Sequence, residues 1–228
     1  MKRYCPRLVT IRLPLDKNKW LYLVNVHFPD DSKPIALRQA FLERFERAVG
    51  ARHQGDIMVI GGDWNACTGS NADFDDGVCG GHGDGYLNTA GRVVRQLAAS
   101  HSLVDLVTWE RQEMEVSFFD RRNGKAKQLD RFFVRSEHHH LVTSCRTEEM
   151  LVDSDHESVK LHLRVEGGKP ARRTVRQRAA KKNIAGTFGK GAGKVKRVAA
   201  ITAISDSFHT NVEGETDDYT RLTNALDK

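Results

Sequence analysis

The sequence has little cysteine and proline, and no apolar run approaches the roughly 20 residues that a membrane-spanning helix needs. Its N-terminal stretch MKRYCPRLVT lacks the apolar core of a signal peptide. The four cysteines form no C-x-x-C pair, which excludes a disulfide framework and a zinc-knuckle spacing. We therefore expect an intracellular chain with free thiols and no membrane segment.

Positive charge is distributed unevenly along the chain, whose formal net charge is +6. Residues 169–228 hold 13 Lys and Arg against 6 Asp and Glu, whereas residues 1–168 hold 23 against 24. A nearly neutral body with a basic tail suits an enzyme that holds a polyanion outside its catalytic cleft.

We divide the chain into a folded body at 1–166, a basic flexible linker at 167–197 and a helical connector at 198–228. The linker has 11 basic residues and no acidic one, so it cannot bury enough apolar surface to fold alone. Its basic residues are expected to hold phosphates without reading sequence; they include Arg172, Arg173, Lys181 and Lys182. A nuclear-targeting signal and a plain solvated linker are the alternatives.

Hydrophobic periodicity predicts strands and helices along the body. Residues 20–27 are rich in aromatic and β-branched types and predict a strand, whereas 35–49 have helical spacing, with Ser32 and Pro34 as the expected start. The apolar run at 56–60 fits a buried strand that we expect Gly61-Gly62 to stop. A helix is also predicted at 88–100, with strands near 104–107, 115–119, 129–134 and 158–165. This order predicts an α+β layered sandwich rather than a doubly wound sheet.

The segment GGDWN places Asp63 and Asn65 directly beyond the strand predicted at 56–60. Loops at strand ends are where rigid scaffolds present reactive groups. A simple capped turn is the alternative interpretation of this motif.

Three further segments carry groups suited to phosphate chemistry. Asp130 interrupts an otherwise apolar strand and needs a partner, for which a histidine is the natural candidate. Asp155 and His156 are adjacent on a bend and could supply a metal ligand and a phosphate-facing imidazole, or belong to an ordinary surface loop. His27 ends the strand predicted at 20–27, just before a turn.

Four segments resemble, in their order along the chain, the core signatures of the endonuclease/exonuclease/phosphatase superfamily, which includes DNase I and the apurinic/apyrimidinic endonucleases. These segments are VNVHFP, GGDWN, QLDRFFV and SDHESV. The stretch NTAGRVVRQLAASHSLVDLVTW is similar to the Asn-x-x-Gly helix and following strand of the endonucleases of LINE-type retrotransposons. The likeness covers residues 1 to about 166. It implies a DNA-cleaving phosphodiesterase with Mg²⁺ or Mn²⁺ as cofactor and, in a parent polyprotein, a reverse transcriptase as partner.

The resemblance also implies roles for the residues that match. Asp63 would orient or deprotonate the attacking water, and Asn65 would stabilise the charge of the transition state. Asp155 would hold the metal together with Asp63 and Asn65. His156, paired with Asp130, would contact the scissile phosphate or act as general base, so the proton acceptor stays open between His156 and Asp63. His27 would contact the phosphate.

The family pattern begins with two strands that precede the match, one with an active-site Asn and one with a metal-binding Glu. Neither is found here, and Glu43 and Glu46 fall on the predicted helix instead. We therefore expect an N-terminally truncated copy of the DNase I-like four-layer α/β sandwich. Two rival functions follow: an impaired domain that only binds nucleic acid, and a phosphatase of lipid or inositol phosphates.

Two further stretches are not expected to carry the chemistry. The spacing of the glycine-rich residues 80–85 fits neither the Walker nor the dinucleotide-binding pattern, and we expect a flexible loop beside the active site. His138, His139 and His140 are consecutive and would point in different directions, so an exposed turn is expected rather than a metal site.

Overall fold

The computed structural model describes residues 1–165 apart from 16–17, 71–75, 84, 112–115 and 150–153. The predicted linker and connector, with Arg172, Arg173, Lys181 and Lys182, lie outside the described residues. The described part belongs to one compact unit. None of its helices is long and apolar enough to cross a membrane.

A mixed six-stranded sheet forms the centre of the molecule, in the order β1-β2-β3-β4-β8-β5. Only β3 and β4 run parallel, and helix α1 connects them. The strands are β1 (Lys2–Cys5), β2 (Leu8–Pro14), β3 (Trp20–His27), β4 (Ile57–Asp63), β5 (Leu103–Asp105) and β8 (Asp130–Arg135).

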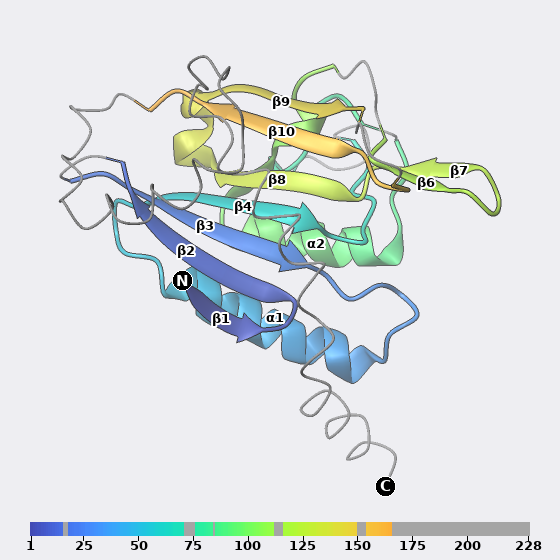
Figure 1. The fold of residues 1–228 in the computed structure, drawn as a ribbon, viewed down its shortest axis with the longest axis horizontal. Helices are drawn as coiled ribbons and strands as arrows, with labels where there is room; N and C mark the ends of the chain where they lie inside the picture. Colours follow the sequence, from blue (N-terminus) through green and yellow to red (C-terminus); the bar gives the residue numbers. More distant parts are fainter. Residues whose placement is uncertain (16–17, 71–75, 84, 112–115, 150–153, 166–228) are drawn as a thin grey trace, which may run out of the picture. The chain divides into compact units, whose positions relative to one another are not determined.

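Smaller elements complete the described part. Strands β9 (Val142–Glu148) and β10 (Ser158–Leu163) form an antiparallel pair, and β6 (Phe118–Asp120) and β7 (Lys125–Lys127) form a hairpin that projects from the body (Figure 1). The helices are α1 (Ile35–Gly50) and α2 (Thr89–Ser100), with short 3₁₀ turns η2 (Leu106–Thr108) and η3 (Ser136–Leu141).

The two faces of the central sheet bury different partners. On one face, an aromatic cluster joins the sheet to α1, and Ala90, Val94 and Ala98 of α2 belong to the same core; the aromatic residues are Phe28, Phe41, Phe45, Trp64 and Phe133. On the other face, aliphatic residues of the sheet pack against β9 and β10, including Val59, Val134, Cys145 and Leu161. The described residues thus form an α/β/β arrangement, which confirms the predicted α+β class and supplies three of the four expected layers.

Most predicted elements are confirmed, within a few residues. The strand at 20–27 and the helices at 35–49 and 88–100 match β3, α1 and α2. The helix α1 begins after Pro34 without a side-chain cap, and Ser32 bonds Asp30 instead.

The expectation that Gly61-Gly62 stops the fourth strand was wrong, because β4 runs through both glycines to Asp63. A Cβ on Gly62 would lie 2.0 Å from the carbonyl oxygen of Val26 on β3, and its φ of +137° suits glycine alone. The glycines therefore let β4 continue while it packs closely against β3 and β8. Asp63 is the last residue of the strand rather than the first of a loop.

Other expectations were wrong in detail. Residues 104–107 divide between β5 and the 3₁₀ turn η2. The consecutive histidines lie in the 3₁₀ turn η3, where His140 is exposed and His138 and His139 are half-buried. Strands β1, β2, β7 and β9 were not predicted, because their short segments mix polar and apolar residues without a clear alternation.

Candidate active site

Strand register brings three of the predicted residues to one edge of the sheet. His27 ends β3 beside Asp63 at the end of β4, and Asp63 pairs with Asp130 at the start of β8. The backbone N–H of Trp64 donates to the carbonyl of Leu129 at 3.0 Å, which ties the two chain segments together just beyond the strands.

His156 reaches this edge from the segment before β10. An isolated bridge pairs it with Phe118, and the backbone N–H groups of Phe119 and Glu157 hold the segment against β6. The His156 Nδ1 atom lies 2.8 Å from Asp130 Oδ2. The prediction that a histidine partners the Asp130 carboxylate is confirmed by this contact, although that carboxylate is half-buried rather than fully buried.

Ser117 holds the Asp130 carboxylate in place. Its buried hydroxyl donates to Asp130 Oδ2 at 2.8 Å and accepts from the backbone N–H groups of Leu129 and Asp130. A carboxylate fixed in this way fixes the tautomer and orientation of the imidazole bonded to it. Sequence reasoning missed Ser117, which lies outside the four motifs.

The pKa of His156 lies above its ordinary value. The hydrogen bond to Asp130 is the largest cause, burial opposes it, and the charges of Asp130, Asp63 and Asp155 add to the rise. The imidazole therefore carries a positive charge over a wider pH range than a solvated histidine.

Burial raises the pKa of the Asp63 carboxyl to about 6, and the charge of Asp130 adds to the effect. The Asn65 backbone N–H, His156 and Arg7 oppose it. The side chain of Asp63 is 22% exposed, so a water molecule can still reach it. A carboxylate with this pKa can accept a proton near neutrality, which an ordinary aspartate does poorly.

Asn65 acts on Asp63 from the turn that follows β4. Its φ of +46° is tolerated by asparagine better than by most residues, and its backbone N–H donates to Asp63 Oδ1 at 2.8 Å. Its side-chain Nδ2 donates to the Phe28 carbonyl at 2.9 Å and to Asp63 Oδ2 at 3.2 Å. Both amide hydrogens are thus engaged, and the side chain orients Asp63.

His27 and Arg7 border the same carboxylate. His27 Nε2 lies 3.8 Å from Asp63 Oδ2, and the backbone N–H of His27 donates to the Arg7 carbonyl. The Nη1 atom of Arg7 is buried and has no hydrogen-bond partner in the described part of the chain. Sequence reasoning missed Arg7, which stands alone in a turn with no motif around it.

The helix α2 supports the turn that carries Asn65. Asn88 caps α2 by accepting from the Gly91 N–H at 2.7 Å, and it also accepts from the Cys67 N–H. A Cβ on Gly91 would lie 1.8 Å from the Cys67 carbonyl oxygen. The glycine therefore allows the helix to contact the backbone two residues beyond Asn65.

The predicted metal ligands are only partly gathered. Asp63 and Asn65 share one corner of the site, whereas Asp155 is exposed. Across the described residues, no three His, Cys, Asp or Glu side chains lie close enough to hold a metal ion. The desolvated Asp63 carboxylate would be stabilised by a cation, but the described residues do not complete the ligand set for one.

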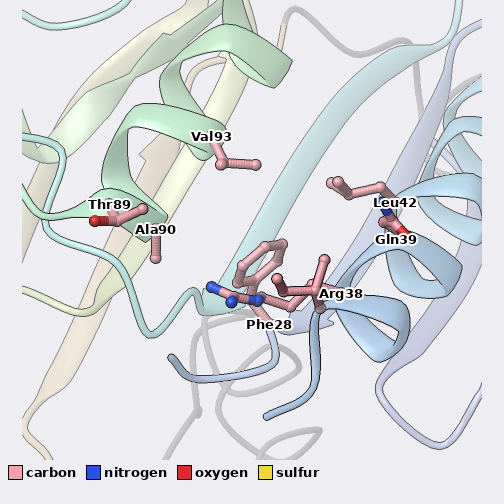
Figure 2. Close-up of a pocket in the computed structure, with 8 residues that line it drawn as sticks. Phe28, Arg38, Gln39, Leu42, Thr89, Ala90 and Val93 are labelled. Atoms are coloured by element: carbon pink, nitrogen blue, oxygen red, sulfur yellow. The ribbon is translucent and has the colours of Figure 1, made fainter. Parts of the chain in front are cut away.

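An apolar cavity of about 250 Å³ lies between α1 and α2 (Figure 2). Its lining comprises Phe28, Ile35, Arg38, Gln39, Leu42, Thr89, Ala90 and Val93. Phe28 links this lining to the candidate active site, because its backbone carbonyl accepts from Asn65 Nδ2. The cavity holds no acid–base pair and is separate from the candidate active site.

The chain matches no protein-family model and no curated protein sequence. It is similar to the solved structure of the endonuclease domain of TRAS1, a telomere-specific non-LTR retrotransposon, with a TM-score of 0.50 and 21% identity over 70% of this chain and 64% of that one. A second match is AP endonuclease LMAP from Leishmania major, with a TM-score of 0.49 and 18% identity over 70% of this chain and 55% of that one. A third is 3′ phosphatase NExo from Neisseria, with a TM-score of 0.48 and 14% identity over 69% of this chain and 64% of that one. The chain spans less than two thirds of each of these structures. The likeness to the TRAS1 domain shows that the described residues have the DNase I-like α+β fold.

Proposed function

We propose that this chain is a phosphodiesterase domain that hydrolyses DNA phosphodiester bonds as an endonuclease. The observation that carries the proposal is the hydrogen-bonded Asp130–His156 pair next to Asp63, whose carboxyl has a pKa of about 6. An imidazolium held beside a carboxylate that titrates near neutrality is suited to attack by water on a phosphate.

His156 and Asp63 have different roles, which follow from their charges. His156, whose pKa is raised, contacts a non-bridging phosphate oxygen and stabilises the negative charge that develops there. Asp63 accepts the proton of the attacking water, and Asn65 and Arg7 hold that carboxylate in its reactive orientation and partly ionised. His27, at the edge of the same corner, contacts the phosphate.

Dependence on Mg²⁺ or Mn²⁺ is part of the proposal as an expectation from the resemblance, with Asp63, Asn65 and Asp155 as its ligands. Among the described residues, His, Cys, Asp and Glu side chains do not by themselves complete an ion site.

The hairpin β6–β7 supports DNA as the substrate. It carries Lys125 and Lys127, which line a hollow of about 410 Å³ with Tyr86. Arg121 in its turn donates to the carbonyl of Ser154, two residues before His156. Positive charge that adjoins the acid–base pair favours a polyanion whose phosphates extend beyond the cleaved bond.

A plasmid-nicking assay with Mg²⁺ tests the proposal. Nicking is expected for the full chain and is expected to be lost with EDTA, in Asp63→Ala and in His156→Ala. The matched controls are Asp31→Ala, an exposed aspartate on the loop before α1, and His162→Ala, an exposed histidine on β10. Nicking that survives both site substitutions unchanged would refute the assignment.

The incomplete ligand set favours one alternative, a domain that binds nucleic acid without cleaving it. Salt-dependent DNA binding with no nicking, even at high Mn²⁺, supports that alternative, and robust turnover excludes it. Hydrolysis of phosphoinositides in preference to plasmid DNA supports a lipid phosphatase instead. A retrotransposon origin, a reverse transcriptase partner and an intracellular, nuclear location are proposals that rest on the sequence resemblance.

A further inference from the structure

Arg131 is a fully buried cation directly behind the candidate active site. It is 1% exposed and follows Asp130 on β8. Its Nη1 donates to Asp105 Oδ2 at 2.7 Å, its Nη2 to the Gln128 carbonyl at 2.7 Å and its Nε to the Ala66 carbonyl at 3.3 Å. The planar guanidinium thus donates in three directions at once.

The two carbonyls belong to the two chain segments that present the reactive groups. Ala66 directly follows Asn65, and Gln128 lies two residues before Asp130. The hydrogen bond from the Trp64 N–H to the Leu129 carbonyl also joins these segments, just beyond the ladder between β4 and β8. Arg131 therefore fixes the distance between the Asn65 turn and the Asp130 strand start.

Asp105 holds the guanidinium in this position. Its carboxylate is 0% exposed, accepts from the Thr68 hydroxyl at 2.8 Å as well as from Arg131, and lies at the end of β5. Thr68 stands on the same loop as Ala66, so Asp105 fastens that loop twice.

A fully buried ion pair is a weak source of stability, because desolvation of the charges offsets their attraction and apolar replacements are often as stable. The hydrogen-bond geometry of the Arg131–Asp105 pair explains its burial better than a contribution to stability does. We propose that Arg131 and Asp105 are a positioning pair, which holds Asn65 and the Asp130–His156 pair in register across the sheet edge. The catalytic consequence rests on the proposed function, whereas the positional one does not.

Arg131→Lys tests the pair, with Arg95→Lys as a matched control. Lysine keeps the charge and can still meet Asp105, but a single ammonium nitrogen cannot reproduce the three-way fork. Arg95 is also buried, at 3% exposed, and also bonds one carboxylate and two backbone carbonyls: those of Asp76, Thr68 and Ser70. Its carbonyls lie farther along the loop from Asn65.

Two NMR signals report the geometry without any need for activity. They are the side-chain amide pair of Asn65 and the Nδ1 proton of His156 in its bond to Asp130. Arg131→Lys is expected to shift both signals and to speed their exchange with solvent, whereas Arg95→Lys leaves them at their wild-type positions. In nicking assays, kcat is expected to fall on the order of 10- to 100-fold in Arg131→Lys with KM little changed.

The outcomes separate the two proposals. Displaced signals in Arg131→Lys without any nicking by the wild type support the positioning pair and count against the nuclease. Wild-type signals in folded Arg131→Lys, or equal shifts in the Arg95→Lys control, overturn the positioning pair whatever the activity. If Arg131→Lys does not fold, the isosteric Asp105→Asn replaces it, with the same signals and the same criteria.

Discussion

Asp63 is held with its carboxyl largely desolvated, so the substitution Asp63→Asn should change how stability depends on pH. The native carboxyl binds its proton more tightly than the unfolded one, since its pKa rises from 3.8 to about 6. The unfolding free energy of the wild type therefore falls as the pH rises from about 4 through about 6. Asparagine is nearly isosteric and carries no charge, so the variant loses this dependence.

The magnitude follows from the shift. About 2 pKa units correspond to about 3 kcal/mol of native-state destabilisation once Asp63 is fully ionised. Asparagine retains an acceptor for the Asn65 backbone N–H but loses the one that faces Asn65 Nδ2, which costs about 1 kcal/mol. We expect Asp63→Asn to be about 2 kcal/mol more stable than the wild type at neutral pH, and about 1 kcal/mol less stable near pH 4.

Urea unfolding of both proteins in EDTA, from about pH 4 to about pH 8, measures the difference. Titration of His156 occurs in both proteins and largely cancels in the comparison. Asp31→Asn, at an exposed aspartate, is the control and should follow the wild type. A constant difference between Asp63→Asn and the wild type across this range would mean that the Asp63 carboxyl is solvated, and the general-base role would lose its physical basis.

Three further substitutions probe the candidate active site and the β6–β7 hairpin. Asp130→Asn should lower the pKa of His156, because the bond to Asp130 is the largest cause of its rise, and an NMR titration that finds no change would contradict this. Arg7→Gln should raise the pKa of Asp63 above about 6, since the Arg7 charge opposes that rise, and the acid limb of the pH–rate profile should move upward with it. Lys125→Gln on the β6–β7 hairpin should weaken DNA binding and reduce the slope of log affinity against log salt by about 1; an unchanged slope would remove that lysine from the interface.

The sequence by itself determined the parts that depend on local pattern. The apolar periods of β3, α1 and α2 are long and regular, so their positions follow from the residues alone. A carboxylate in an apolar strand requires a partner wherever the chain folds, which is why Asp130 pointed to a histidine. The four motifs, in their order along the chain, also predicted the DNase I-like fold.

Spatial contacts between residues that are far apart along the chain decided the rest, and these contacts exist only in the folded molecule. Register across three strands sets Asp63 beside Asp130 and His27, and a single bridge to Phe118 delivers His156. No sequence pattern shows that Arg7, which lies outside every motif, will border the carboxylate of Asp63 at the end of β4.

The same reason hides the buried pair of Arg131 and Asp105, which are 26 positions apart and meet at 2.7 Å. Local pattern decides which face of a strand is buried, because each side chain responds to its own neighbours in the chain. Desolvation, hydrogen bonding and charge at a site depend on which strands lie side by side. The pKa of Asp63 and the position of Asn65 are therefore properties of the tertiary structure, whereas the residues that can use them are already present in the sequence.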